Sequence, residues 1–526
     1  MWRALGFVFL LLTAGSQADA VARELRWARS ADAATLDPHA TNDAITNNLL
    51  YQVYEPLLIR RGEGKLEPAL ATHWQQAADP TVWEFTLRKN VLFHDGTTLS
   101  ADDVLFSLKR AQNSRTPVRL NLTTVIGFAK KDDNIISIKT SSPDPILPAK
   151  LTNVFVVSRA WVVKNANGKT DEENVAGGFF AKNENGTGPY KITAREIDVK
   201  TTLTRFDGYW DKSKKGFDVI SYLPVRSAAT RIAALLSGDV DFVQDVAVQD
   251  VARLQSQAAV RVRSGPENRT VFLSLNVDPK NIKNFAGKNP LAEPKVREAI
   301  DLAIDRAALT KGVMRGLAVP LGTYVPPFVS GYERTQDIQV KPDLKRAREL
   351  LAEAGYPSGF RLVLHCSNDR LPNDEAICTA LANALDRIGI KTTPVARPFA
   401  VHLPAMYRAE TDFYLMSTGF PTFDSSFNLD LFVHSRTATG GGSINVTGYK
   451  NPDVDRDIEA IATSADNQQR IRLMQAVWKR VKQDRPYIPL YGLVSSYAMA
   501  PFIDIPVDPS GIVYFKYVKG VHVVAQ

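Results

Sequence analysis

The sequence predicts a mixed α/β protein built from more than one lobe. The chain has 526 residues, whereas a single hydrophobic core rarely grows beyond about 250–300 residues. Short segments with the two-residue alternation of half-buried strands recur along it, and segments with helical spacing of apolar residues lie between them. No unit of about 20–50 residues repeats, which excludes solenoids and propellers.

The first clear elements lie before residue 141. The segment VWEFTLRKNVLF (82–93) alternates large apolar with polar residues, as a half-buried strand does. Ser100 and Asp103 then have the spacing of a capping box, which predicts a helix that includes residues 104–111. The segment IISIKT (135–140) predicts a further strand.

The same two patterns continue to the C-terminus. Pro294 favours the first turn of a helix whose apolar face reaches to Ala307, and Asp343 and Gly355 suit the start and the stop of another. Two more helices are predicted over residues 375–389 and 468–483. Further strands are predicted over residues 190–197, 201–206, 361–366 and 487–492.

The N-terminus has the three parts of a secretory signal peptide, predicted over residues 1–20. Arg3 gives the positive start, an apolar run follows from Ala4 to about Gly15, and Ala18-Asp19-Ala20 resembles a cleavage site. The apolar run is shorter than the roughly 20 residues that span a bilayer. Because no cysteine follows, we expect a mature chain from Val21, outside the cytoplasm and without a lipid anchor.

Composition argues against a nucleic-acid partner. The net charge is +8 and the pI about 9.2, but lysines and arginines are scattered and form nothing longer than pairs such as Lys130-Lys131. Nucleic-acid binding proteins usually gather such charges on one face. We therefore predict no nucleic acid among the partners.

The two cysteines, Cys366 and Cys378, are too few for a structural zinc site, which takes about four ligands. In an oxidising compartment a local disulfide is the natural prediction. Two free buried thiols are the alternative.

Motifs of catalysis are missing. The seven histidines are dispersed, and neither a H-E-x-x-H motif nor a G-x-S-x-G motif occurs. The sequence therefore predicts no catalytic residues, no cofactor and no metal centre. A secreted hydrolase whose catalytic residues converge from distant positions remains as the alternative outside binding.

Several motifs resemble one family. GTGPYKI (186–192) followed by RFDGYWD (205–211) is similar to the signature of the peptide- and nickel-type extracytoplasmic solute-binding proteins of ABC importers. The segments 87–110 and 295–309 resemble the same pattern. The order of TLDPH (35–39), YEPL (54–57), these motifs and LLAEAGY (350–356) also matches, so the resemblance covers essentially the whole mature chain.

The resemblance implies a two-lobed clamp with an additional third domain. Lobe I would be discontinuous, over residues 21–56, 187–268 and 487–526. The additional domain II would span 57–186 and lobe III 269–486. Hinges are expected near Asn268 and at Arg485-Pro486, and Gly186 and Gly188 would allow positive φ at a turn between lobes.

Such a protein acts by capture and delivery. The resemblance implies a monomeric periplasmic receptor that closes around a solute and docks on the membrane permease subunits of an importer, which work with cytoplasmic ATPases. A receptor that senses its ligand without transport is an alternative.

The family's peptide binders usually hold the ligand's amino group with an aspartate after a strand that ends in Gly-Trp. Here that strand is FYLMSTG (413–419), Thr418 stands at the tryptophan's place, and Phe420 or Pro421 at the aspartate's. Asp424 is the nearby acid that could substitute. Followed by two serines, it suits an Asx-turn equally well.

Other candidate ligand contacts follow from the same resemblance. Arg370 falls near a carboxylate-binding arginine of the dipeptide branch, and a planar guanidinium suits that task. The remaining candidates are Thr41, Asn42 and Asp43 on the first lobe, with Phe399, Phe420 and Phe423 as apolar walls. Turn-forming or core roles are their alternatives.

The predicted cargo is a short peptide or a peptide-like amino-acid conjugate. A metal chelate or an opine-like ligand is the rival, and for the chelate His434 or His365 would matter.

Overall fold

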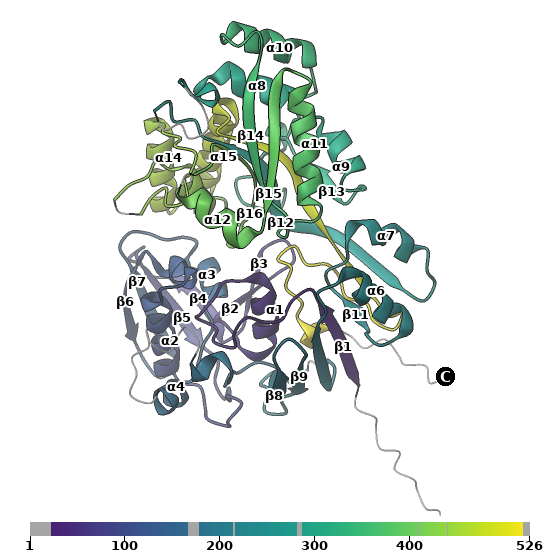
Figure 1. Ribbon diagram of the computed structural model, residues 1–526. Coiled ribbons are helices and arrows are strands. Elements are labelled where there is room, and N and C mark those ends of the chain that lie inside the picture. The colour runs from purple at the N-terminus through teal and green to yellow at the C-terminus, as the bar shows by residue number, and fades with distance from the viewer. Residues whose placement is uncertain are drawn as a thin grey trace, which may run out of the picture.

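The computed structural model describes residues 23–166, 178–213, 216–280, 287–408, 410–438 and 440–518 (Figure 1). The predicted signal peptide (1–20) lies outside the described residues. Figure 1 shows a lower part, formed by the first half of the chain and its C-terminal end, and an upper part formed by the green and yellow-green segments.

The strands of the lower part are β1 (Glu24–Arg29), β2 (Leu58–Arg61), β3 (Lys65–Pro68), β4 (Ala71–Gln76), β5 (Val82–Leu87), β6 (Val125–Lys130), β7 (Ile135–Thr140), β8 (Tyr190–Glu196), β9 (Lys200–Arg205), β10 (Val219–Pro224) and β11 (Phe242–Val243). Its helices are α1 (Ala44–Val53), α2 (Ala101–Asn113), α3 (Leu147–Lys150), α4 (Arg159–Asn165), α6 (Ala228–Ser237) and α7 (Val248–Gln255).

The upper part holds β13 (Ala318–Pro320), β14 (Phe360–Ser367), β15 (Ile390–Arg397) and β16 (Phe413–Gly419). Its helices are α8 (Pro294–Ala303), α9 (Arg306–Gly312), α10 (Leu344–Glu353), α11 (Asp374–Asp386), α12 (Phe399–Tyr407), α13 (Ser426–Asn428), α14 (Pro452–Thr463) and α15 (Asn467–Asp484). The long strands β12 (Arg261–Leu275) and β17 (Tyr487–Met499) run between the two parts (Figure 1).

One mixed sheet spans both parts, in the order β15-β14-β16-β12-β17-β11-β1-β10-β9-β8. In its centre β12 pairs with β17 antiparallel, and the register shifts between Pro266 and Thr270. That shift includes Asn268, where a hinge is predicted, and a register break bends paired strands locally. The two parts are therefore joined by two adjacent strands.

A second sheet, β4-β5-β7-β6, belongs to the left of the lower part in Figure 1. Buried apolar residues of β5, β7 and α2, such as Phe85, Ile138 and Val104, form its core. The hairpin of β2 and β3 lies beside it and reaches towards the upper part (Figure 1).

The cores separate the upper part from the lower. Ile488, Leu490 and Tyr491 of β17 pack in the upper core, whereas Tyr497 and Met499 pack in the lower one. The second crossing therefore lies within β17, later than the predicted hinge at Arg485-Pro486. The other domain boundaries stay predictions.

Local sequence rules explain several elements. Ser100 and Asp103 form the predicted capping box of α2, with the Ser100 amide donating to the Asp103 carboxylate at 2.9 Å. Asp343 caps α10 by accepting from the Arg346 amide at 2.9 Å. The helix predicted from Pro294 to Ala307 is instead two helices, because Asp305 caps a new start at α9. The strand predicted over 82–93 ends at Leu87.

The glycines of GTGPY serve a close approach of two segments. A Cβ on Gly186 would lie 1.9 Å from the Val53 carbonyl oxygen, and one on Gly188 would lie 2.6 Å from the Gln52 carbonyl oxygen. Neither glycine has a positive φ, so the predicted reason for them was wrong. The segment contacts the end of α1 so tightly that only glycine fits.

The motif TLDPH (35–39) ties the first segment to α2. Asp37 accepts two hydrogen bonds from Arg110, at 2.9 and 2.6 Å, and both side chains are buried. His39 lies beside them, and burial together with the Arg110 charge lowers its pKa to about 4. The neutral ring donates from Nε2 to the Phe155 carbonyl and accepts at Nδ1 from Arg110. This motif is part of the packing rather than of a catalytic site.

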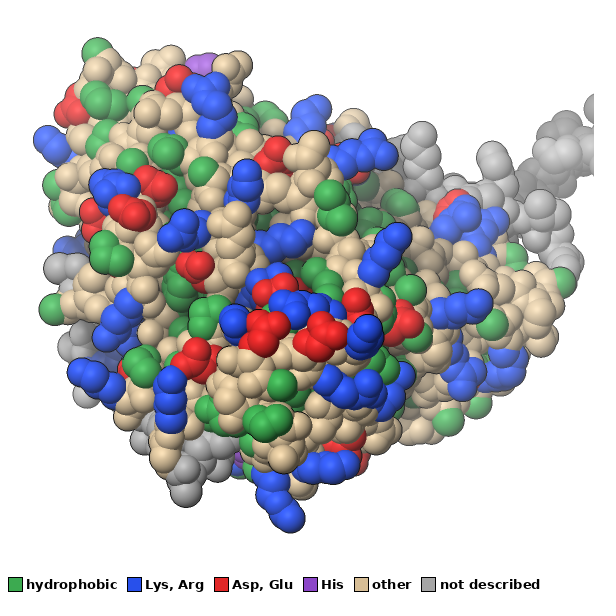
Figure 2. Space-filling view, turned by 90° about the horizontal axis from the view of Figure 1, so that it is seen from above, with side chains coloured by type: hydrophobic (Ala, Val, Ile, Leu, Met, Phe, Trp, Pro, Cys, Tyr) green, Lys and Arg blue, Asp and Glu red, His purple; other side chains and the backbone are tan. Residues whose placement is uncertain are grey.

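Charges on the surface are mixed. Figure 2 shows acidic and basic side chains interspersed over the face that is seen from above, without a wide field of one sign. Pairs such as Arg346 with Glu353, 2.7 Å apart, neutralise one another locally. None of the helices within the described ranges is long and apolar enough to cross a membrane.

Candidate functional site

Three loops leave the same edge of the upper sheet. Strands β14, β15 and β16 are parallel to one another, and their carboxyl ends are Ser367, Arg397 and Gly419. Ligands of α/β proteins commonly bind outside the carboxyl ends of parallel strands. The loops that follow these ends carry Arg370 and Phe399, and the segment from Phe420 to Asp424. In Figure 1 this edge faces the lower part.

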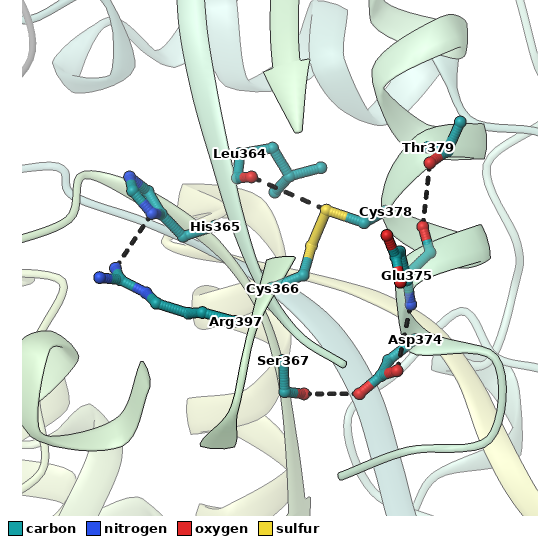
Figure 3. Close-up of a disulfide and its surroundings, with 9 residues drawn as sticks. All are labelled: Leu364, His365, Cys366, Ser367, Asp374, Glu375, Cys378, Thr379 and Arg397. Carbon is teal, nitrogen blue, oxygen red and sulfur yellow. Dashed lines mark hydrogen bonds between the residues drawn. A yellow bond between two sulfur atoms is a disulfide. The ribbon is translucent and has the colours of Figure 1, made fainter. Parts of the chain in front are cut away.

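The loop with Arg370 is held at both ends (Figure 3). A disulfide joins Cys366, at the end of β14, to Cys378 in α11, with the two Cα atoms 6.3 Å apart. The buried Asp374 accepts a hydrogen bond from the Ser367 hydroxyl at 2.8 Å (Figure 3). It also accepts one from the Arg370 amide at 3.1 Å. The backbone of Arg370 is thus fixed, while its side chain remains exposed.

Removing the disulfide is expected to destabilise this loop. It closes a loop of sequence separation 12, and a loop of that size contributes about 2–4 kcal/mol to the free energy of unfolding. We expect a Cys366→Ala/Cys378→Ala variant to unfold at correspondingly lower urea concentration, as followed by circular dichroism. A Thr379→Ala variant, with the disulfide intact, is the control. An unchanged midpoint in the double variant would contradict a stabilising disulfide.

The Arg370 guanidinium lies between a ring and several charges. It sits 5.1 Å from the centre of the Phe399 ring. Desolvation lowers the pKa of Arg370, as does the nearby Arg269 charge, and the carboxylates of Glu267 and Asp43 act in the opposite direction. Arg370 is therefore an exposed cation on which the Asp43 carboxylate of the lower part acts electrostatically.

Asp43 lies at the start of α1 in the lower part. It caps α1, with its Oδ2 accepting from the Thr46 amide at 2.8 Å, and its side chain is exposed. Thr41 accepts from the Asp43 amide at 3.1 Å, and Asn42 accepts from the Asn47 side chain at 3.2 Å. Thr41 and Asn42 shape the turn, and the Asp43 carboxylate opposes the desolvation that lowers the pKa of Arg370.

The hinge strand contributes two charged residues that the sequence reasoning missed. Arg269 donates to Glu267 at 3.0 Å and to the Ser417 hydroxyl at 3.4 Å, and Glu267 accepts from Ser495 at 2.8 Å. Both lie in the register break of β12. In the sequence, only their position beside Asn268, where a hinge is predicted, could have indicated that these two residues lie near the site.

The three predicted aromatic walls have different places. Phe399 is half-buried at the start of α12, and its amide donates to Asp369 at 2.7 Å. Phe420 is 1% exposed and belongs to a core of the upper part. Phe423 is 6% exposed, with its ring against Arg60. Only Phe399 shares the surroundings of Arg370.

Asp424 is engaged inside the upper part. Its carboxylate oxygens each lie 3.2 Å from Arg470 Nη2, and the two side chains are 9% and 3% exposed. Oδ1 also accepts from the Ser426 amide at 3.0 Å. This bond forms the Asx-turn that was the predicted alternative to a ligand contact. The structure thus brings Arg370 and Phe399 into contact, with Asp43 acting on the Arg370 charge, whereas Asp424 is paired with Arg470.

The histidines considered for a metal chelate lie apart from Arg370. His365 Nδ1 accepts a hydrogen bond from Arg397 at 3.1 Å, and burial and that charge lower the pKa of His365 to about 4. His434 lies 3.8 Å from Asp455 and 3.5 Å from Glu459, and its pKa is raised despite its burial by the Ser435 carbonyl and these carboxylates. Within the described ranges, no group of three or more His, Cys, Asp and Glu side chains is placed to hold a metal ion.

Sequence comparison places most of the chain in one family. The family model of bacterial extracellular solute-binding proteins, family 5, matches residues 65–440. A relative is the glutathione-binding protein GsiB of Salmonella paratyphi A, which is 28% identical over 463 residues, 87% of this chain and 86% of the relative.

Solved structures share the fold along almost the whole chain. The periplasmic binding protein DppA of Helicobacter pylori, in complex with the peptide STSA, has a TM-score of 0.79 at 24% identity, covering 95% of this chain and 98% of that one. AgaA of A. tumefaciens R10, in complex with agropinic acid, has a TM-score of 0.77 at 22% identity, covering 95% and 99%. The predicted fold and family are confirmed. The chain belongs to the bacterial extracellular solute-binding proteins of family 5, the non-catalytic binding components of ABC importers.

Proposed function

We propose that this receptor captures a short peptide or peptide-like conjugate that carries both a carboxylate and an amine. The observation that supports this cargo is that Arg370 of the upper part and Asp43 of the lower part are both exposed, and that the Asp43 carboxylate opposes the desolvation that lowers the pKa of Arg370. A cation on one part and an anion on the other match the two ends of a zwitterion. Buried or half-buried ligand charges require such partners, because an unpaired charge away from water is costly.

The roles of the residues follow from their geometry. Arg370 offers a planar fork to the carboxylate, and Phe399, on whose ring it lies, provides an apolar wall beside it. Asp43 has one oxygen bound to the Thr46 amide, and its other oxygen would accept from an amine. Glu267 and Arg269 form an ion pair in the register break of β12, so together they add no net charge near Arg370.

The mechanism is capture and delivery without a chemical step. The lobes close about the register break of β12, and the closed form docks on the permease subunits of the importer. We place this receptor in the periplasm, as a monomer released by cleavage of its signal peptide. This proposal includes three domains. Lobe I comprises residues 21–56, 187–268 and 487–526, domain II comprises 57–186, and lobe III comprises 269–486, with the second crossing between lobes moved into β17.

Calorimetric titration with a panel of di- and tripeptides, glutathione, an opine-type conjugate and nickel–histidine tests the cargo. We expect heat from at least one peptide or peptide-like compound with a free carboxylate and a free amine. Silence of all peptides together with binding of nickel–histidine would contradict the proposal. Consumption of the bound compound, followed by mass spectrometry, would indicate an enzyme instead.

Replacing Arg370 with glutamine is expected to weaken this binding about 10–100-fold, because a hydrogen bond to a charged group contributes about 1.5–3 kcal/mol. The panel compound that binds the wild-type protein best is the probe. Arg361→Gln, at the opposite, exposed end of β14, is the matched control and should bind like wild type. Equal affinities of the Arg370 and Arg361 variants would exclude Arg370 as a ligand contact.

An opine-like conjugate is the second candidate. AgaA, which shares the fold, was solved with agropinic acid, and such conjugates combine acid and amine groups as peptides do. Binding of the opine-type compound with silence of the peptides would select this candidate.

A further inference from the structure

The two parts of the molecule touch at a second place besides the hinge strands. From below, the β2–β3 hairpin presents Arg60 and Gly64. From above comes the loop after β16, with Pro421 and Phe423. The Phe423 ring lies so close to Gly64 that a Cβ there would be 2.8 Å from Phe423 carbon atoms. We call this contact the clasp.

Arg60 is the centre of the clasp. Its guanidinium donates to the Pro421 carbonyl of the upper loop and, at 2.7 Å, to the Ala149 carbonyl of the lower part. It also lies 5.1 Å from the centre of the Phe423 ring. The residue is 5% exposed, and no carboxylate lies within ion-pair distance of it among the described residues.

Each side of the clasp is braced from its own part of the molecule. The hairpin is held by Asp508, which accepts from the Gly62 amide at 2.7 Å, and the Tyr514 hydroxyl donates to the Arg60 carbonyl at 3.4 Å. The upper loop is held by the Asp424–Arg470 ion pair and by backbone hydrogen bonds to Ser330. The two loops therefore meet as preformed surfaces.

The backbone of Phe423 has a strained conformation at the clasp. Its φ of 53° is unusual for a residue other than glycine. The turn is held by the Ser330 amide, which donates to the Phe423 carbonyl at 3.0 Å, and by the Ser425 amide, which donates to the Ser330 carbonyl at 3.1 Å. This conformation directs the ring to Arg60 and Gly64.

We propose that Arg60 is a positioning residue for solute capture, which stabilises the closed arrangement of the lobes through the clasp independently of any ligand. The clasp exists only while the lobes are closed, because Pro421 and Phe423 move away with the upper part when the hinge opens. In the open form one side of the guanidinium would return to water while the bond to Ala149 remains, so closure exchanges hydration for the Pro421 carbonyl and the Phe423 ring. The ligand-free receptor then populates the closed form to a measurable extent.

The burial of Arg60 supports an interaction of this kind. Desolvation lowers its pKa to about 10, so the side chain still carries its charge at neutral pH. Arg60 is buried against carbonyl oxygens and a ring instead of a carboxylate, and such a contact only partly offsets the free energy of removing the charge from water. Such a contact can form and break during a binding cycle, which a buried ion pair would hinder.

Single-molecule FRET on the ligand-free receptor tests the clasp. Dyes are attached at Ile126→Cys and Ile338→Cys, on the additional domain and on the upper part, which are 63% and 68% exposed. The two native cysteines are joined in the disulfide, so only the new thiols react. We expect Arg60→Gln to lower the ratio of closed to open molecules about tenfold, because the hydrogen bond from the charged guanidinium to the Pro421 carbonyl is lost.

Arg61→Gln is the matched control. Arg61 is the next residue of β2, but it lies over the Tyr517 ring at 4.0 Å and beside Glu67 at 3.4 Å, away from the upper part. It should leave the ratio unchanged. If Arg60→Gln does not fold, as judged by circular dichroism, Phe423→Leu removes the ring from the upper side and should shift the ratio in the same direction. A ligand-free receptor that is fully open, or variants at Arg60 and Phe423 with the wild-type ratio, would overturn the proposal.

Discussion

Replacing Asp424 with alanine is expected to lower the free energy of unfolding by about 3–5 kcal/mol, because it leaves Arg470 as a buried charge without its carboxylate. Arg470 is 2% exposed and its Nη2 lies 3.2 Å from both Asp424 oxygens. Urea unfolding followed by circular dichroism measures the loss. The same substitution also removes the Asx-turn that begins at Asp424.

Two controls separate the buried charge from the turn. Glu410→Gln disrupts an exposed pair with Arg408 on the same part of the molecule and should leave the midpoint unchanged. The double variant Asp424→Leu/Arg470→Met removes both charges and should recover most of the stability. A single variant as stable as the wild-type protein would contradict a structural role for Asp424.

Replacing Asp37 with alanine should have an effect of similar size, about 3–5 kcal/mol. Arg110 loses a bidentate carboxylate in a place where the two side chains are 0% and 2% exposed. The pair joins the first segment to α2. We therefore expect a lower free energy of unfolding for the whole lower part, measured by urea denaturation. Asp133→Asn, which is 89% exposed in its side chain beside Lys130, is the control. Equal midpoints of the two variants would contradict this account of the TLDPH motif.

Local patterns predicted most elements because their causes lie within a few residues. The capping box at Ser100, the cap at Asp343 and the strands at 135–140 and 190–196 depend on neighbours in the sequence. The length of β17 could not be predicted, since its residues after Gly492 are strand only because β11 and β12 lie beside them. The split of α8 from α9 depends on Asp305, whose cap competes with a continuous apolar face.

The site was predictable to the extent that the family resemblance applied. It led to Arg370 and Phe399, which the structure brings into contact, and to Asp43, which acts on the Arg370 charge, although their contact with ligand stays a prediction. The partner of Asp424 is Arg470, 46 residues later, and that of Arg60 is Pro421, 361 residues later. No local pattern carries pairings of such separation, because they are set by how the loops meet in space.

The central claim is that Arg370 holds the ligand's carboxylate and Asp43 its amine. It is tested most directly by titrating the best-binding peptide, its C-terminal amide and its N-acetyl form into the wild-type protein, Arg370→Gln and Asp43→Asn. Asn preserves the helix cap while removing the charge. We predict that amidation weakens wild-type binding about 10–100-fold but hardly affects Arg370→Gln, and that acetylation behaves likewise with Asp43→Asn. If each modification cost the same affinity in the variant as in the wild-type protein, the claim would be contradicted.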